Sequence, residues 1–356
     1  MNLQTEICSL FEIDYPIVQA GMAGGITTPE LVAAVSEAGG LGTLGAGYLT
    51  PEVTRNAIRE IRSCTDCPFA VNLFKVDMQQ EDQRTASVQQ RLLPIYEELD
   101  ITPSTQKLVV TDNYEEQFDI LIEERVPVIS TTFGVPTDDQ VKRAHHHGIK
   151  LMTMVTTVKE AVQAEKAGVD AVVAQGGEAG GHRGTFEVKN GRGAAIGTFA
   201  LIPQVVDHVS IPVIAAGGIM DGRGLVAARA LGAEGIQLGT RFLNAVESGT
   251  DPVYKKALHE SDEESTELTT AFSGRPARAI RNRFVDFLQS NRIEPLSYPI
   301  QNLLTKEIRA AAKQQGKPEY MSLWSGQGNR LIKDGQTAEE IIKKIITEAE
   351  KTSGIL

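Results

Sequence analysis

Residues 172–184, VVAQGGEAGGHRG, combine a histidine, a carboxylate and five glycines in one short stretch. The stretch begins with small apolar residues, as is typical of a strand buried on both faces. It then becomes a loop whose glycines let backbone approach a flat or anionic ligand closely. The pKa of a histidine is easily moved across neutrality, so His182 could serve as acid, base or positive charge. We predict that His182 is the catalytic residue and that Glu178 orients the loop.

Two further pairs of residues that contain glycine, Gly217-Gly218 and Gly239-Thr240, each end a short apolar run. Phosphates often bind after the last two strands of a parallel barrel, where backbone N–H groups attract anions. A helix that begins behind Asp221 would add to this attraction. The alternative is that the glycines only make tight turns. We favour the phosphate site, because the two pairs follow neighbouring strands.

Two polar side chains interrupt otherwise apolar runs. Asn72 lies within FAVNLF, and Gln175 ends the run before the glycine loop. A buried amide needs a hydrogen-bond partner. That partner is either a cofactor ring or a neighbouring loop, and the residues themselves leave both possibilities open.

A cluster of histidines and a pair of cysteines are not expected to form a metal or redox site. His145, His146 and His147 are consecutive, so in a helix they splay around the axis and cannot easily converge on one metal ion. Cys64 and Cys67 stand at the end of a predicted helix, whereas a thioredoxin-type pair opens one. We therefore predict no metal site, and we interpret the cysteine pair as structural or incidental.

The composition limits the partners. The net charge of −11 over 356 residues is unfavourable for binding nucleic acid or anionic membranes. The N-terminus has neither the basic nor the apolar segment of a signal peptide, and no run approaches a membrane span. The three cysteines do not suggest a disulfide framework. We expect a cytoplasmic protein that acts on a small molecule.

Short apolar runs alternate with amphipathic helices eight times over residues 16–240. This alternation predicts a parallel sheet with right-handed crossovers. A (β/α)8 TIM barrel fits best, with an open doubly wound sheet as the alternative. The runs expected to form strands are 16–19, 41–44, 69–74, 126–130, 149–154, 171–174, 213–216 and 235–238.

The chain after residue 243 has a different character. We predict a barrel domain over 1–243, with a polar insertion at about 75–115, and a smaller, mainly helical C-terminal lid domain with a closing segment over 244–356. The lid contains the basic cluster 273–283 and the only tryptophan, Trp324.

Four motifs, QAGMAGG, QGGEAGGHRG, AAGGI and QLGTRF, make the chain resemble the nitronate monooxygenase family over almost its whole length. The resemblance implies a (β/α)8 barrel with FMN at its mouth and a smaller lid domain. It also implies conversion of alkyl nitronates and O2 to carbonyl compounds and nitrite.

The resemblance assigns roles residue by residue. His182 corresponds to the active-site histidine, as base for neutral nitroalkanes or polar partner of a nitronate, and residues 324–327 correspond to the lid segment facing the site. The expected FMN contacts are Met22, Gly24, Asn72, Gln175, Gly180, Gly181, Gly217, Gly218, Gln237, Leu238, Gly239 and Thr240.

Two other functions are compatible with these residues. The related FMN-dependent enoyl-acyl-carrier-protein reductase, which uses NAD(P)H, shares the AGGH and AAGGI segments. The stretches FAVNLF and SGRPAR favour the monooxygenase over it. A phosphate-binding or isomerase barrel without flavin is a third possibility. The oligomeric state, with a homo-oligomer possible, is left open.

Overall fold

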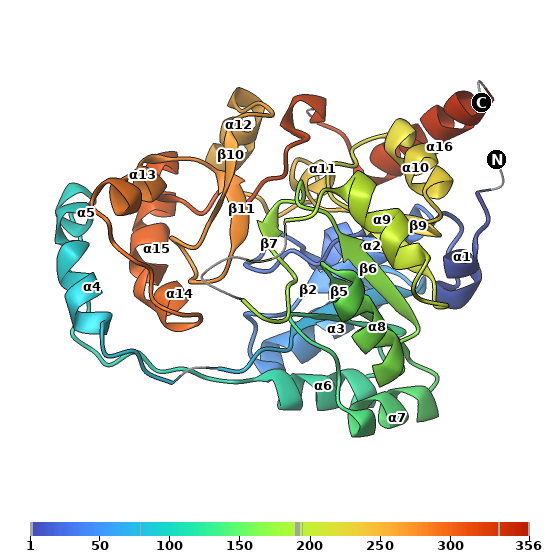
Figure 1. Ribbon diagram of the computed structural model, residues 1–356, viewed down its shortest axis with the longest axis horizontal. Helices are drawn as coiled ribbons and strands as arrows, with labels where there is room; N and C mark the ends of the chain where they lie inside the picture. Colours follow the sequence, from blue (N-terminus) through green and yellow to red (C-terminus); the bar gives the residue numbers. More distant parts are fainter. Residues whose placement is uncertain (1–2, 79, 189–192, 194, 334, 355–356) are drawn as a thin grey trace.

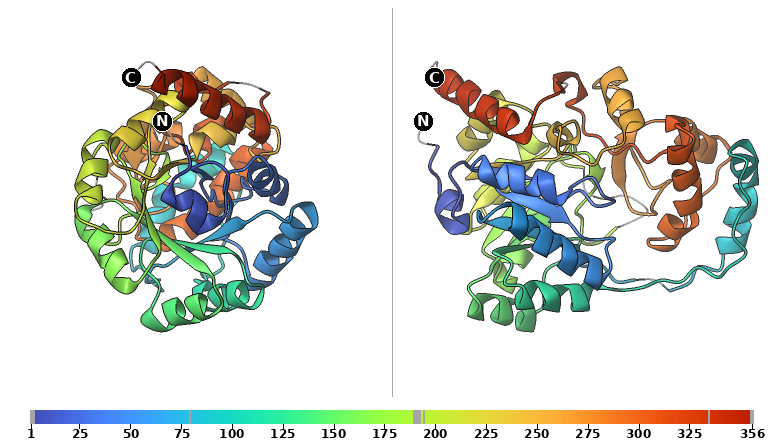
Figure 2. Two further views of the ribbon diagram at one scale, coloured as in Figure 1. Left: turned by 90° about the vertical axis from the view of Figure 1, so that its right-hand side faces the viewer. Right: turned by 180° about the vertical axis from the view of Figure 1, so that it is seen from behind.

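Eight parallel strands close into a barrel in the computed structural model, which describes residues 3–78, 80–188, 193, 195–333 and 335–354. The spatial order is β1-β9-β8-β6-β5-β4-β3-β2, and a parallel bridge between Val18 and Leu41 joins the two ends. Figure 2 shows the closed ring from one end. The strands are β1 (Ile17–Gln19), β2 (Gly42–Gly45), β3 (Phe69–Phe74), β4 (Val128–Thr132), β5 (Lys150–Val155), β6 (Ala171–Gln175), β8 (Val213–Ala216) and β9 (Gly235–Leu238). The predicted (β/α)8 barrel is confirmed, and the open sheet is excluded.

Helices surround the barrel, and several begin where the sequence predicts. Thr28 and Thr50 each accept a hydrogen bond from the backbone N–H three residues on, with proline at the next position. Both features stabilise a helix start. The surrounding helices are α2 (Pro29–Glu37), α3 (Pro51–Cys64), α6 (Tyr114–Glu123), α7 (Asp138–His146), α8 (Val158–Ala167), α9 (Thr198–Val206), α10 (Gly222–Ala230) and α16 (Ala338–Ser353).

The barrel interior is filled by alternate strand residues, because successive side chains of a strand point to opposite faces. Val18, Met152 and Ile214 point inward and are fully buried. The short helix α1 (Glu6–Phe11) adds Ile7 and Phe11 to this inner cluster. It therefore plugs one end of the barrel and leaves the opposite end for a site.

The lid lies beside the barrel, at the left in Figure 1, and has a hydrophobic core of its own. Phe272, Phe284 and Tyr320 are among its fully buried side chains. Its elements are α12 (Pro252–Glu260), β10 (Thr266–Thr269), β11 (Ala277–Ile280), α13 (Arg283–Ser290), α14 (Ile300–Leu304), α15 (Lys306–Gln314) and the 3-10 turns η1 (Pro318–Tyr320) and η2 (Asn329–Leu331). The short helix α11 (Thr240–Leu243), whose Phe242 packs in the barrel core, precedes the lid.

The insertion after β3 forms two consecutive helices, α4 (Thr85–Arg91) and α5 (Leu93–Glu98), which follow one another in the same direction on the far side of the lid (Figure 1). Its buried Leu92 and Tyr96 belong to the hydrophobic core of the lid. Conversely, Ile341 and Ile345 of α16 belong to the core of the barrel. The division of the chain into domains remains a prediction. The packing supports a boundary that assigns α4 and α5 to the lid and α16 to the barrel.

One small sheet joins the two parts, and the sequence did not predict it. Residues Gly181–His182 form β7, which pairs antiparallel with lid strand β11 so that His182 lies opposite Ala277. Strand β10 completes this three-stranded sheet. The glycine loop that follows β6 is therefore held by the lid as well as by the barrel.

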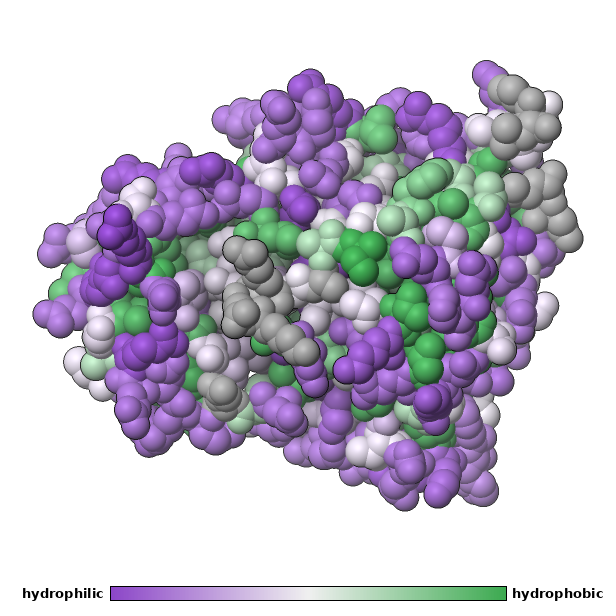
Figure 3. Space-filling view, viewed as in Figure 1, coloured by the Kyte–Doolittle hydropathy of each residue, from purple (hydrophilic) through white to green (hydrophobic). Residues whose placement is uncertain are grey.

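The face of the molecule drawn in Figure 3 is largely hydrophilic, with separate hydrophobic groups between the polar residues. Such a surface suits the acidic composition. Within the described residues, no helix is both long and apolar enough to cross a membrane.

Candidate active site

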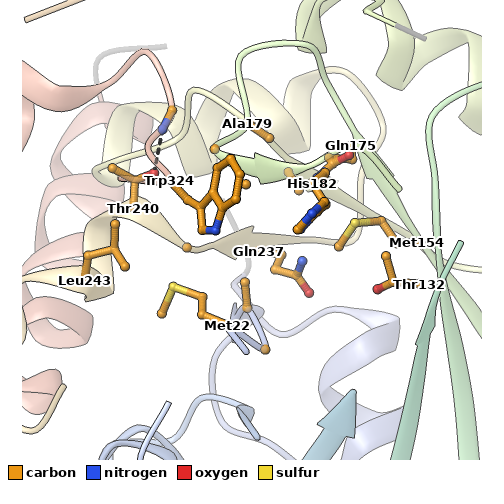
Figure 4. Close-up of a pocket in the computed structure, with 18 of the residues that line it drawn as sticks. Met22, Thr132, Met154, Gln175, Ala179, His182, Gln237, Thr240, Leu243 and Trp324 are labelled. Carbon is orange, nitrogen blue, oxygen red and sulfur yellow. Dashed lines mark hydrogen bonds between the residues drawn. The ribbon is translucent and has the colours of Figure 1, made fainter. Parts of the chain in front are cut away.

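A pocket opens between the barrel and the lid, at the end of the barrel opposite α1. It holds about 1060 Å³ of space not filled by protein atoms, including the part open to solvent. Strand ends contribute Asn72, Gln175 and Gln237, while the lid contributes Trp324 and Gly326. In Figure 4, Trp324 and His182 lie above Gln237 and Met22. The pocket therefore lies where the active sites of (β/α)8 enzymes are found, at the carboxyl ends of the strands.

Most of the predicted site residues line this pocket. They are Met22, Asn72, Gln175, Gly180, Gly181, His182, Gly217, Gly218, Gln237, Gly239 and Thr240. Two predicted contacts do not. Leu238 packs in the core between strands and helices at 1% exposure, and Gly24 lies at an exposed turn. Their predicted contact with a cofactor remains a prediction without support from the pocket geometry.

The glycines bring lid and loop into close contact. A Cβ on Gly180 would lie 2.4 Å from the backbone nitrogen of Gly326, so no larger residue fits there without movement. Gly326 N–H donates to Thr240 Oγ1 at 3.0 Å, and Gln327 N–H donates to the Glu178 carbonyl at 3.0 Å. The lid segment 324–327 is therefore attached directly to the loops that line the pocket.

Gly217 and Gly218 have φ angles of +111° and +70°, in the region that favours glycine. Together with Gly239 they line one wall of the pocket without side chains. Such a wall lets a ligand reach the backbone N–H groups.

His182 stands among aromatic rings and one hydroxyl. Its Nε2 lies 2.8 Å from Ser273 Oγ of the lid, and either atom can be the donor. The centroid of its ring lies 5.1 Å from that of Trp324 and 5.9 Å from that of Phe133. Phe74 extends the aromatic group, with its ring centroid 4.9 Å from that of Phe133. The imidazole therefore faces an apolar space and has one fixed polar partner.

The surroundings hold the imidazole in its neutral form. Burial lowers the pKa of His182 to about 3, and the positive charges of Arg275 and Arg309 add to the effect. Both guanidiniums are themselves largely buried, which lowers their pKa values, that of Arg275 to about 10. Desolvation and like charges both disfavour the protonated imidazole. At neutral pH His182 is therefore uncharged beside two cations.

Both arginines are bonded to neutral groups. Arg275 donates to the carbonyl of Thr185, and its guanidinium carbon lies 4.1 Å from the centroid of the Phe133 ring. Arg309 donates to the carbonyl and the side chain of Asn302, at 2.7 and 2.9 Å. Because these partners carry no negative charge, both cations contribute positive potential near the pocket.

The glycine loop is held in shape by its own polar side chains. Gln175 donates to the carbonyl of His182 at 3.0 Å and accepts from Gly184 N–H at 2.9 Å. The fully buried Arg183 donates to the Gly176 carbonyl at 2.7 Å. Glu178 accepts from the backbone and hydroxyl of Thr198, which supports its predicted role in orienting the loop. The amide of Gln175 is thus occupied by the loop, which was one of its two predicted alternatives.

The Asn72 side chain is also occupied by protein. Its Nδ2 donates to Ser130 Oγ at 2.9 Å and to Thr132 Oγ1 at 3.0 Å, both on the neighbouring strand β4. Asn72 still lines the pocket. The sequence left the hydrogen-bond partner of the Asn72 amide open, and the structure places that partner on a neighbouring strand. A contact between Asn72 and a ligand would be in addition to these two hydrogen bonds.

Several site residues were missed from the sequence. Phe133 has a φ angle of +79°, which is rare for a residue with a bulky side chain and typical of functional sites. Ser273 and Arg275 lie in the SGRPAR stretch, whose basic character was noticed but not its contact with His182. Nothing in the sequence indicated that Arg309 lies near the site, because it occurs within an ordinary helical pattern.

The two other clusters stay outside the site. His145 and His146 end α7 and His147 follows as its cap residue, and all three are exposed. Cys64 is exposed at the end of α3. Among the described residues, no group of three or more His, Cys, Asp or Glu side chains could hold a metal ion.

The fold and the pocket define an enzyme of the (β/α)8 class. Comparison with known proteins identifies the family: a model of the nitronate monooxygenase family matches residues 4–348. The chain belongs to the nitronate monooxygenase family, whose members are oxidoreductases and in general flavoenzymes. A probable nitronate monooxygenase from Staphylococcus saprophyticus is 43% identical over 353 residues, which cover 99% of each chain.

Two solved structures resemble the chain over nearly its full length. Nitroalkane oxidase from Streptomyces ansochromogenes is 39% identical with a TM-score of 0.91, covering 98% of this chain and 99% of its own. FabK from Thermotoga maritima is 34% identical with a TM-score of 0.78, covering 99% of this chain and 98% of its own.

Proposed function

We propose that the protein uses FMN and O2 to oxidise alkyl nitronates to carbonyl compounds and nitrite. The observation that carries the proposal is a pocket lined by His182 and by glycines, with the buried Arg275 and the half-buried Arg309 near the imidazole. A nitronate is an anion, and positive potential in a partly desolvated pocket stabilises an anion more than it would in water. The same potential disfavours a cationic substrate.

We expect FMN to occupy this pocket. Gly217, Gly218 and Gly239 would hold the phosphate, since all three line the pocket and have no side chain of their own. Gln237 and Met22 would flank the ring system from the strand ends. The flavin supplies the electron-accepting chemistry when it is bound, and the protein supplies binding and orientation.

The chain's own residues bind and orient the substrate. His182 and Ser273 form one polar edge of the pocket, and Trp324 and Phe133 exclude water around it. A nitronate needs no base, because it is already deprotonated. A neutral nitroalkane must lose a proton, and Nδ1 or Nε2 of His182 can accept it. The low pKa makes His182 a weak base, so we expect nitronates to be better substrates than neutral nitroalkanes.

The test is oxygen uptake by the FMN-loaded protein given a small alkyl nitronate without NAD(P)H. We expect uptake with nitrite formed in proportion. Protein that holds FMN but consumes no oxygen would contradict the proposal.

The enoyl reductase remains the alternative, since the chain also resembles FabK. It predicts rapid bleaching of the flavin by NAD(P)H and turnover of an enoyl thioester. Those two measurements on the same preparation separate the functions.

A further inference from the structure

A second pocket lies between the loop after β8, the start of α11 and the C-terminal helix α16. It holds about 750 Å³ of space not filled by protein atoms, including the part open to solvent. The lining residues that matter here are Arg241, Lys333, Lys344 and Glu348, with Met220 at the border. We propose that this basic pocket binds a phosphate-bearing anion. The proposal does not depend on the reaction at His182.

The charge of this pocket is opposite to that of the whole chain. Among the residues that the structure describes, five basic side chains line it, against two carboxylates, in a protein whose net charge is −11. The basic residues are Arg223, Arg241, Lys333, Lys344 and Lys351, and the acidic ones are Asp221 and Glu348. Cations gathered in this way repel one another unless an anion lies among them.

Arg241 provides a buried donor that needs a partner. The residue is 3% exposed and lines the pocket. One nitrogen, Nη2, donates to Gln336 Oε1. The other, Nη1, is buried and has no hydrogen-bond partner among the described residues. A buried donor without a partner is costly, and an anion in the pocket would satisfy it.

Two lysines, Lys333 and Lys344, line the same pocket. The nearby Lys333 lowers the pKa of Lys344, and the burial of Lys344 and the charge of Arg241 add to the effect. Asn244 fixes the backbone of Lys333 by donating to its carbonyl at 2.9 Å. The three cations therefore converge, and a shared anion would replace their repulsion by attraction.

Each of the two carboxylates pairs with one cation of the pocket and also accepts a hydrogen bond from the backbone. Asp221 caps α10 through Arg223 N–H at 3.0 Å and pairs with the Arg223 guanidinium at 2.5 Å. Glu348 accepts from Gly222 N–H at 3.3 Å, and its other oxygen lies 3.8 Å from Lys344 Nζ. Two carboxylates cannot neutralise five cations. A phosphate group, with up to two negative charges and several acceptor oxygens, suits the remaining donors.

The basic pocket adjoins the cofactor pocket but is separate from it. Met220 lines both. Thr240 lines the cofactor pocket, whereas the next residue, Arg241, lines the basic pocket. Inorganic phosphate could also enter an empty cofactor site, so the test requires protein saturated with FMN.

The test is calorimetric titration of inorganic phosphate into the FMN-saturated full-length protein at constant ionic strength. We expect one saturable site per chain. Lys344→Gln and Lys333→Gln should each weaken binding about tenfold, since each removes a charged partner. Glu348→Gln should tighten binding, because it removes a competing negative charge but keeps an acceptor for Gly222.

Lys343→Gln is the matched control. Lys343 neighbours Lys344 on α16 and carries the same charge, but its side chain is 71% exposed and pairs with Glu339 instead. Phosphate binding should be unchanged in this variant. Melting temperature and FMN content would be checked for every variant. Absence of saturable binding, or equal weakening by Lys343→Gln and Lys344→Gln, would overturn the proposal.

Competition identifies the source of the phosphate. A nucleoside monophosphate that displaces inorganic phosphate would show that the pocket takes phosphate esters. Failure to displace it would assign the pocket to free phosphate. Either result supports the site.

Discussion

Nε2 of His182 lies 2.8 Å from Oγ of Ser273, although 91 residues separate them in the chain. Ser273 belongs to the lid and His182 to a loop of the barrel. The serine hydroxyl also lies 3.2 Å from the carbonyl of Arg275. Because the hydroxyl has one proton, it can donate to the imidazole or to this carbonyl, but not to both at once. The lid therefore influences which nitrogen of His182 carries a proton.

Ser273→Ala should reduce activity on neutral nitroalkanes about three- to tenfold, because the imidazole loses the partner that orients it. Activity on preformed nitronates should change less, since no proton has to be removed. The measurement is kcat/KM for a nitroalkane and its nitronate. Ser290→Ala, at an exposed position that ends α13, is the control. Equal losses on both substrates would mean that Ser273 supports the pocket generally.

His182→Asn should lower kcat/KM on neutral nitroalkanes by about ten- to a hundredfold, at or below the contribution typical of a positioned base, because the low pKa makes His182 a weak one. Preformed nitronates should retain most of their rate, because they need only binding and orientation. Steady-state oxygen uptake on both substrates is the measurement. If both rates fell together, His182 would not act as a base.

The free energy of unfolding should decrease as pH is lowered, and His182 should account for part of this decrease. Its pKa is lowered to about 3 in the folded protein, against about 6.5 when unfolded. Between these values the unfolded chain binds a proton that the folded protein excludes. The free energy of unfolding therefore decreases as pH falls from about 6.5, by at most about 1.4 kcal/mol per pH unit from this residue.

Urea unfolding of wild type and His182→Gln at pH 7.5, 6 and 5 measures this contribution. The variant should show a shallower loss of stability on acidification. His146→Gln, at the exposed end of α7, controls for removal of a histidine as such. Parallel pH profiles for wild type and His182→Gln would contradict the expected protonation behaviour.

Gly180→Ala should weaken attachment of the lid. The added Cβ would lie 2.4 Å from Gly326 N and 2.5 Å from the carbonyl carbon of Ser325, both backbone atoms that cannot move aside cheaply. We expect a lower melting temperature, by several degrees, and faster loss of FMN on dilution. Gly354→Ala, whose Cβ would meet nothing closer than 3.6 Å, should leave both unchanged. An unchanged FMN release rate would show that the lid contact does not retain the cofactor.

The sequence by itself determined the barrel. Runs such as 69–74 and 213–216 were predicted at their observed positions, because a parallel strand covered on both faces is uniformly apolar. Thr28-Pro29 and Thr50-Pro51 marked helix starts for a local reason, since capping involves residues within one turn. The pairs Gly217-Gly218 and Gly239-Thr240 were also predicted to lie at one end of the barrel. The reason is again local, because each pair directly follows a strand.

Only the tertiary structure decided which residues surround His182. The pairing of β7 with β11, the contact with Ser273 and the nearby charge of Arg309 all join segments more than ninety residues apart. No periodicity encodes such contacts. The same holds for the consecutive helices α4 and α5, whose apolar residues pack against the lid and not against the barrel from which they emerge. Local patterns specify which face of an element is buried, but the partner on that face is selected by the packing of the whole chain.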